Sequence, residues 1–551
     1  MADKTPRPPF TPQLDAVRAS EINTALADLS CEERKDGPKA ADERPSSRSS
    51  RNIHGEPLKR SFMQEMEELA CSLIVWEPSQ KVERYLEKLA AGQPLVGRPR
   101  RFRVADWVLF ELAAQVWGGY RAADRNLADR KHWKRLRKAV RKAWPNQPHW
   151  RLSRRAISRS QYHRFRNKLL RIPHPDGNPV LFELFKQVID LLSLMGALDI
   201  GLFDPSMGSV TNPHTSQAIL GDATWITAIN RNPPPGQPGH DPKRPCDTST
   251  RQIPGGNAYG HIAVFNIARN PYKNERIILT SDLLPQSPGK SDANLFTETI
   301  LKMLEEHPDL TRGLRAAVYD MALRSTDIDK LQDHGIHAIV KTPRTAKGKT
   351  AAVNLGNHTF KNPNTKTTQD LLVSAIHGTP TITLPDGDGH TAYQPLQRIK
   401  SQIKTNRSGR KTIYGTWAIP DRPIVPPHLV GATTLIRHNS TIEERHSKPH
   451  RRRTRGLRSI PECDPIFKPL HGTRQDSEST NSQFKAPLPH GRARTKGRHR
   501  LQLNLLAFQM ATLNTALIAH RKRTGADITE WYDNHQHSRT SRLNPQPPGL
   551  P

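Results

Sequence analysis

The stretch HGTRQDSESTNSQFK, residues 471–485, carries a glutamate and three possible phosphate ligands at spacings that suit one face of a helix. On a helix that turns by about 100° per residue, these side chains fall within about 60° of one another. They are His471, Arg474, Glu478 and Lys485. Such a helix predicts a surface that can hold a metal ion and contact nucleic-acid phosphates together. Asp476 would lie about 160° away from Glu478 and face elsewhere.

Two further carboxylates are needed, because one glutamate cannot hold the pair of Mg²⁺ ions used in in-line phosphoryl transfer. Asp222 follows the apolar run 218–220, and Asp320 follows the run 314–319. Each run predicts a short buried strand that ends at an aspartate. Either aspartate taken alone is more often a turn or helix-cap residue, so the argument depends on what lies between them.

The segments between and after the two aspartates follow a specific order. They are predicted strands at 259–267 and 276–280, a helix at 292–306, the strand that ends at Asp320, a helix at 326–334 and a strand at 336–341. With the strand before Asp222, this is the order of an RNase H-like α/β fold. The two aspartates then lie on its first and fourth strands.

In these residues the chain resembles a known family, the DDE transposases of bacterial insertion sequences, in the group called insertion-sequence family four. That group carries a Y-R-E-K signature, whose spacing is matched by Arg474, Glu478 and Lys485. His471 stands where the family has tyrosine. The likeness extends over about residues 217–520 and includes the runs GDATWI, AAVYD and GIHAIVK.

The resemblance implies that Asp222, Asp320 and Glu478 are catalytic and hold two Mg²⁺ ions, for which Mn²⁺ can substitute. It implies that His471, Arg474 and Lys485 bind DNA phosphates. The expected activity is transposition, by phosphodiester hydrolysis and strand transfer. A structure-selective nuclease of the same fold and a domesticated DNA-binding protein without cleavage activity remain as alternatives.

The charge of the chain indicates a polyanionic partner. It has 84 Lys and Arg against 52 Asp and Glu, a formal net charge of +32. Such an excess attracts nucleic acid. Basic runs lie at 98–103, 131–142, 450–458 and 492–500. We expect the partners to be the terminal inverted repeats of the element and target DNA, bound by a homodimer on paired ends.

Composition divides the chain into six regions. We expect a disordered N-terminal segment at 1–60, a helical DNA-end-binding domain at 61–200, the first part of an RNase H-like catalytic domain at 201–341, a β-rich insertion at 342–450, its second part at 451–525 and a flexible tail at 526–551. Within the second part, the apolar helix 501–519 should pack against the sheet.

The helical domain contains a candidate DNA reader. A helix at 104–117, a break at Gly118 and Gly119, and a basic helix at 121–144 are compatible with a helix-turn-helix. An ordinary helical bundle with a basic face fits equally well.

Other features favour a cytoplasmic, nucleoid-associated bacterial protein. No apolar stretch is expected to span a membrane. The four cysteines form no C-x-x-C pair, which suits reduced thiols and argues against a zinc finger.

Overall fold

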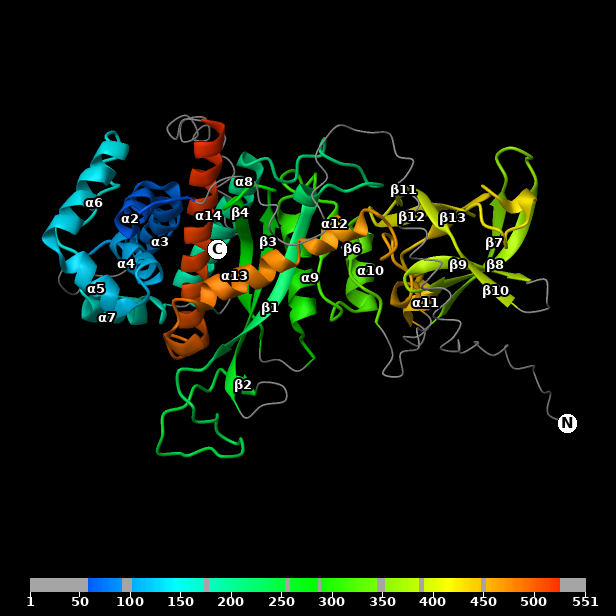
Figure 1. Ribbon diagram of the computed structural model, residues 1–551. Coiled ribbons are helices and arrows are strands. Elements are labelled where there is room, and N and C mark those ends of the chain that lie inside the picture. Colours follow the sequence, from blue (N-terminus) through cyan, green and yellow to red (C-terminus); the bar gives the residue numbers. More distant parts are fainter. Residues whose placement is uncertain are drawn as a thin grey trace. The chain divides into compact units, whose positions relative to one another are not determined.

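The structure is a computed structural model of the 551-residue chain that describes residues 58–91, 102–172, 178–252, 258–285, 289–343, 352–385, 391–446 and 452–525 (Figure 1). The chain forms two compact units. In the described residues, the first unit contains Phe203–Gly221 and Phe296–Gln475. The second contains the chain before residue 203, Asp222–Leu295 and the chain from Asp476 onward. The predicted tail and almost all of the predicted N-terminal segment lie outside the described residues.

The helical part of the second unit contains the helices expected for 61–200. They are α2 (Phe62–Cys71), α3 (Leu73–Ala91), α4 (Val104–Val116), α5 (Tyr120–Ala128), α6 (Arg130–Ala143), α7 (Arg159–Leu169) and α8 (Val180–Asp199). Before α2, the Ser61 hydroxyl accepts the Gln64 N–H, and the Gln64 side chain accepts the Ser61 N–H. Gly118 and Gly119, with φ of 78° and 148°, separate α4 from α5.

The predicted basic helix at 121–144 is two helices. Asp129 separates α5 from α6, because its carboxylate accepts the Lys131 N–H at 2.7 Å and caps α6. Trp133 is buried, and its indole N–H donates to the Ser153 carbonyl at 3.0 Å. The tryptophan is therefore a core residue of the helical region, while most basic side chains of α6 are exposed.

The rest of the second unit is built on an antiparallel pair, β3 (Tyr259–Arg269) and β4 (Arg276–Leu283), with β2 (Arg251–Gln252) beside β3. Helix α14 (Arg498–Thr524) packs against β4 and α8 (Figure 1). This confirms the prediction that the apolar helix after the signature packs on the sheet.

One residue of α14 fixes this packing. The Gln509 amide N–H donates to the Leu279 carbonyl of β4 at 2.9 Å, and its carbonyl accepts the Ser281 hydroxyl at 2.7 Å. Both polar ends of a fully buried side chain are thereby satisfied.

Strand β1 (Ala218–Thr227) begins in the first unit and ends in the second. In the first unit it pairs in parallel with β5 (Ala316–Val318), with Leu220 opposite Val318, and β5 pairs in parallel with β6 (His337–Ile339). In the first unit the hydrogen-bonding order is β1-β5-β6, and in the second unit it is β2-β3-β1, with β4 on β3. Helix α9 (Asp292–Glu306) precedes β5 and α10 (Ser325–Asp333) follows it, as the sequence predicts.

The predicted β-rich region of the first unit is a seven-stranded antiparallel sheet in the order β10-β9-β8-β7-β13-β12-β11. Its strands are β7 (Val353–Lys361), β8 (Thr368–Ile376), β9 (Thr379–Pro385), β10 (Thr391–Pro395), β11 (Gln397–Thr405), β12 (Lys411–Ala418) and β13 (Thr433–Arg437). Its inner face carries a core that includes Phe360, Ile382 and Trp417. The chain is thus a mixed α/β protein.

No apolar stretch of membrane-spanning length was expected from the sequence, yet one described helix, α14, has that length and composition. It is alone among the described helices in this, and 89% of its apolar window is buried inside the protein. Its apolar character therefore reflects its place in the core of the second unit.

Candidate functional site

Asp222 lies inside a strand rather than at its end, because β1 continues to Thr227. This corrects the predicted strand end. The preceding Gly221 is required by packing in the first unit, since a Cβ there would lie 2.1 Å from the Phe296 ring. The Asp222 side chain is partly buried. One carboxylate oxygen accepts the backbone N–H of Ala223 at 3.0 Å.

The other carboxylate oxygen of Asp222 accepts the side-chain amide of Asn481 at 3.0 Å. Asn481 is buried and belongs to α13 (Gln475–Lys485), which therefore packs against β1 beside Asp222. Sequence reasoning missed Asn481. The available signal was its spacing, three residues after Glu478 and four before Lys485, which places it on the same helix stripe.

The two acids of α13 have different surroundings. Asp476 is buried, and its carboxylate pairs with the Arg269 guanidinium at 2.5 Å, while its backbone carbonyl accepts Arg276 at 2.9 Å. Glu478 is exposed. As predicted, Asp476 lies on a different face from Glu478, and its partners show that it helps to hold α13 on β3 and β4.

Lys485 ends α13 and is half-buried. Burial lowers the pKa of its ammonium group, and the negative charge of Asp222 acts in the opposite direction. The predicted phosphate ligand therefore lies within electrostatic reach of the predicted metal ligand.

The signature is not one continuous helix. His471 belongs to α12 (Phe467–Gly472), and Arg474 lies in the turn before α13. The His471 ring stacks on Phe467 with centroids 5.0 Å apart. Burial lowers the pKa of His471, and the positive charges of Lys341 and Arg474 lower it further. The ring is therefore neutral at pH 7 and can still donate one hydrogen bond to a phosphate.

Asp320 follows β5 in the first unit and is partly buried. Its carboxylate accepts the N–H of Ala322 at 2.8 Å, which is the turn role that short acidic residues often have. Asp222 and Glu478 belong to the second unit, so the convergence of the three carboxylates stays a prediction. In the described ranges, no group of three or more His, Cys, Asp or Glu side chains could hold a metal ion.

The basic runs differ in what their side chains do. The run at 131–142 forms the exposed face of α6. In the run at 450–458, Arg458 is buried and donates to the carbonyls of Val340 and Thr454, and Arg453 pairs with Glu444 at 2.8 Å. That run is therefore largely structural in its described part. Most of the run at 98–103 lies outside the described residues.

Comparison with known proteins does not extend these observations. No protein-family model matches the chain, and no curated protein matches it.

Proposed function

We propose that this chain is a DNA transposase whose RNase H-like catalytic domain, interrupted by a β-rich insertion, cleaves and transfers the strands of an insertion sequence with Mg²⁺. One observation carries the proposal. The hydrogen bond from Asn481 to Asp222 joins residues 259 positions apart and places the helix of Glu478 and Lys485 beside Asp222. A carboxylate, a second carboxylate on the packed helix and a nearby ammonium group are what phosphodiester chemistry requires.

Asp320 is the third carboxylate of the proposed site. It follows Val318, which lies opposite Leu220 in the parallel pair of the first unit, by two residues. The proposal requires the Asp320 carboxylate to join those of Asp222 and Glu478.

The residues suit Mg²⁺, because this ion prefers carboxylate oxygens and all three proposed ligands are carboxylates. When bound by Asp222, Asp320 and Glu478, Mg²⁺ would supply Lewis-acid stabilisation of the phosphate oxygens. Mn²⁺ would serve in the same way. Asn481 orients the Asp222 carboxylate, as residues behind metal ligands commonly do.

The remaining chemistry needs no covalent protein intermediate. In hydrolysis, water attacks phosphorus and the bond to the 3′-oxygen breaks, which leaves a 3′-hydroxyl at the element end. In strand transfer, that hydroxyl attacks a target phosphodiester, and the target 3′-oxygen leaves. Lys485 offsets negative charge on the phosphate in both steps, and Arg474 and His471 would hold neighbouring phosphates.

Binding of the element ends is assigned to the helical region of the second unit. Helix α6 buries an apolar stripe of Trp133, Leu136 and Val140. Its exposed basic residues are Arg130, Lys131, Lys134, Arg135, Lys138, Arg141 and Lys142. This arrangement suits contact with duplex DNA, and a homodimer would hold the two ends together.

The proposal is tested with a DNA segment that contains the gene and its flanking sequences. Wild-type protein with Mg²⁺ should cleave at the element ends and join them to a target. Glu478→Gln should abolish both steps, whereas Glu305→Gln, the same change at an exposed position of α9, should not. Cleavage without joining favours the nuclease, and binding without cleavage favours the domesticated protein.

A further inference from the structure

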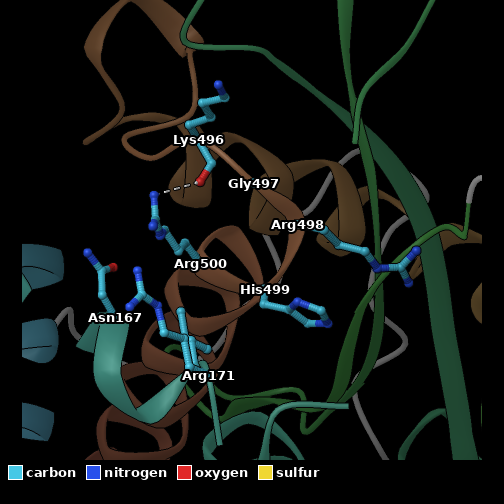
Figure 2. Close-up of a pocket in the computed structure, with 8 residues that line it drawn as sticks. Asn167, Arg171, Lys496, Gly497, Arg498, His499 and Arg500 are labelled. Carbon is cyan, nitrogen blue, oxygen red and sulfur yellow. Dashed lines mark hydrogen bonds between the residues drawn. The ribbon is translucent and has the colours of Figure 1, made fainter. Parts of the chain in front are cut away.

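A hollow of about 470 Å³ lies in the second unit where the end of α7 meets the beginning of α14 (Figure 2). Its lining is dominated by cationic side chains and holds no carboxylate. The lining residues are Asn167, Leu170, Arg171, Lys496, Gly497, Arg498, His499 and Arg500. Asp222 and the signature residues do not line it, so the hollow is distinct from the candidate catalytic site.

The charges at the start of α14 are the reverse of those that stabilise a helix. Its N-cap is Gly497, which offers no capping side chain, and its first turn contains no acidic residue. The first three positions are instead Arg498, His499 and Arg500. Cations at this end oppose the helix dipole at a typical cost of about 0.3–1 kcal/mol each, so the arrangement favours an anionic ligand.

Further cations gather beside the hollow. Burial lowers the pKa of Arg500, and the neighbouring Arg166 lowers it further. Burial also lowers the pKa of His163 to about 4, and Arg166 and Arg159 add to that effect. His163 is therefore uncharged near neutral pH, and a bound anion would relieve the repulsion between Arg500 and Arg166.

Asp247, which contacts the backbone of a lining residue, is already engaged by other donors. The Asp247 carboxylate accepts the N–H of Gly497 at 2.8 Å and both the N–H and hydroxyl of Ser249, at 3.0 and 2.6 Å. The guanidinium of Arg498 is also engaged, since it donates to the Leu283 carbonyl at 2.6 Å and points away from Asn167 and Arg171 in Figure 2. Arg500 makes one long hydrogen bond, from its guanidinium to the Lys496 carbonyl at 3.5 Å (Figure 2). The side chains of Arg171, Lys496 and Arg500 are the cations that can meet a ligand.

Asn167 provides an independent sign of a missing ligand. Its side-chain oxygen is buried, yet it has no hydrogen-bond partner among the described residues. A buried polar atom without a partner is rare and costs about 1–3 kcal/mol. The two ends of an asparagine amide can exchange by rotation, so this side chain can turn an N–H donor toward an anion in the hollow.

We propose that this hollow binds a phosphate group of a nucleic-acid backbone, held by Arg171 and Arg500 with Lys496 and Asn167 beside them. The choice of DNA as the carrier of that phosphate rests on the proposed function. Ten residues separate Lys485 from Lys496, so the chain between them can span at most about 40 Å. This is close to one turn of duplex DNA, about 34–36 Å, so one duplex can reach both places.

The test is the salt dependence of DNA binding by the full-length protein, in EDTA so that no cleavage occurs. A labelled 30-bp duplex of arbitrary sequence is titrated at 50 to 300 mM KCl. For Arg171→Ala/Arg500→Ala, we expect the slope of log affinity against log salt to shrink by about 0.9, one phosphate contact. The same rise in salt would then cost the variant about fivefold less affinity than it costs the wild type.

A matched control is Lys302→Ala/Lys330→Ala, which removes the same charge from exposed positions of α9 and α10, outside the hollow and outside the helical region assigned to DNA binding. It should leave the slope within about 0.3 of the wild type, and Arg171→Lys/Arg500→Lys should restore most of the lost contact. Thermal unfolding of each variant confirms that it is folded. An equal change in slope for the control and the hollow variant would overturn the proposal.

Inorganic phosphate distinguishes a nucleic-acid site from a small-anion site. Suppose that 10 mM phosphate raises the unfolding temperature of the wild type but not of Arg171→Ala/Arg500→Ala, and that both proteins have the same slope of log DNA affinity against log salt. The hollow then binds a free anion, and the proposal is wrong. Because the assay needs neither metal nor cleavage, its result is independent of whether the three carboxylates catalyse transposition.

Discussion

The side-chain amide of Asn481 donates a hydrogen bond to the carboxylate of Asp222 at 3.0 Å and thereby fixes helix α13 against strand β1. Asn481 is buried and lies on the helix stripe that carries Glu478 and Lys485. The contact places the predicted metal ligand of β1 and the signature helix in one unit of the protein.

This contact predicts that Asn481 controls the use of metal. Removal of a residue that orients a metal-binding carboxylate typically weakens metal affinity by about 10–100-fold. Asn481→Ala should therefore raise the Mg²⁺ concentration for half-maximal cleavage by that factor while DNA affinity in EDTA stays unchanged. Ser482→Ala, on an exposed neighbouring position, should change neither quantity. An unchanged Mg²⁺ requirement for Asn481→Ala would remove its assigned role.

The two acids of α13 should have opposite effects on stability and activity. Asp476→Ala leaves the Arg269 guanidinium without its buried carboxylate partner and should lower the free energy of unfolding by about 3–5 kcal/mol. Glu478→Ala should change it by less than about 0.5 kcal/mol, because the side chain is exposed, but should abolish cleavage. Urea unfolding followed by tryptophan fluorescence measures the free energy of unfolding of both variants. Equal losses of stability would contradict the assigned faces of the helix.

Glu275 should make the second unit sensitive to acid. Burial alone would raise the pKa of this carboxylate, but hydrogen bonds from His520 and Arg523 outweigh burial and lower it to about 2. The folded-state pKa lies below the unfolded value of about 4.3, so the stabilisation is fully present above that value and is lost as pH falls toward 2. Glu275→Gln should therefore be less stable than the wild type at pH 7, and the difference should shrink below pH 4. A difference that stays constant from pH 7 to pH 2.5 would contradict this account.

His471 should accept substitution by the residue that the resembling family has. A tyrosine can keep the stacking on Phe467 and supply a hydroxyl donor to a phosphate. His471→Tyr should therefore retain or improve strand transfer, whereas His471→Ala should reduce it. The assay compares joined products at equal protein concentration. If the tyrosine variant is as impaired as the alanine variant, His471 does not occupy the phosphate-binding position.

The sequence predicted much of the fold because hydrophobic periodicity reports directly on strands and helices. The helix predicted at 292–306 has those bounds, and the apolar helix after the signature packs on β4 as expected. Local geometry was less accessible. The turn at Thr473–Arg474 divides the signature, and β1 runs past Asp222 because Ile226 is buried within the second half of the strand. Neither feature has a distinctive residue pattern.

The site was predictable only in part, for a physical reason. Acidic and basic residues at helical spacing can be recognised from sequence, and this identified Glu478 and Lys485. The role of Asn481 depends on a contact with a residue 259 positions away, and no local pattern reports such a pairing. Likewise, Arg458 belongs to a basic run in sequence but is buried and bonded to backbone carbonyls.

The most direct test of the central claim is Mg²⁺-dependent cleavage by three single variants: Asp222→Ala, Asp320→Ala and Glu478→Gln. The substrate is the DNA that contains the gene and its flanks, and binding is measured in parallel without metal. Each variant should bind this DNA with the affinity of the wild type and yield no cleaved or joined product, because the metal ligands are lost and the DNA contacts are kept. Cleavage at the wild-type rate by any one of the three would show that these carboxylates do not form the catalytic site.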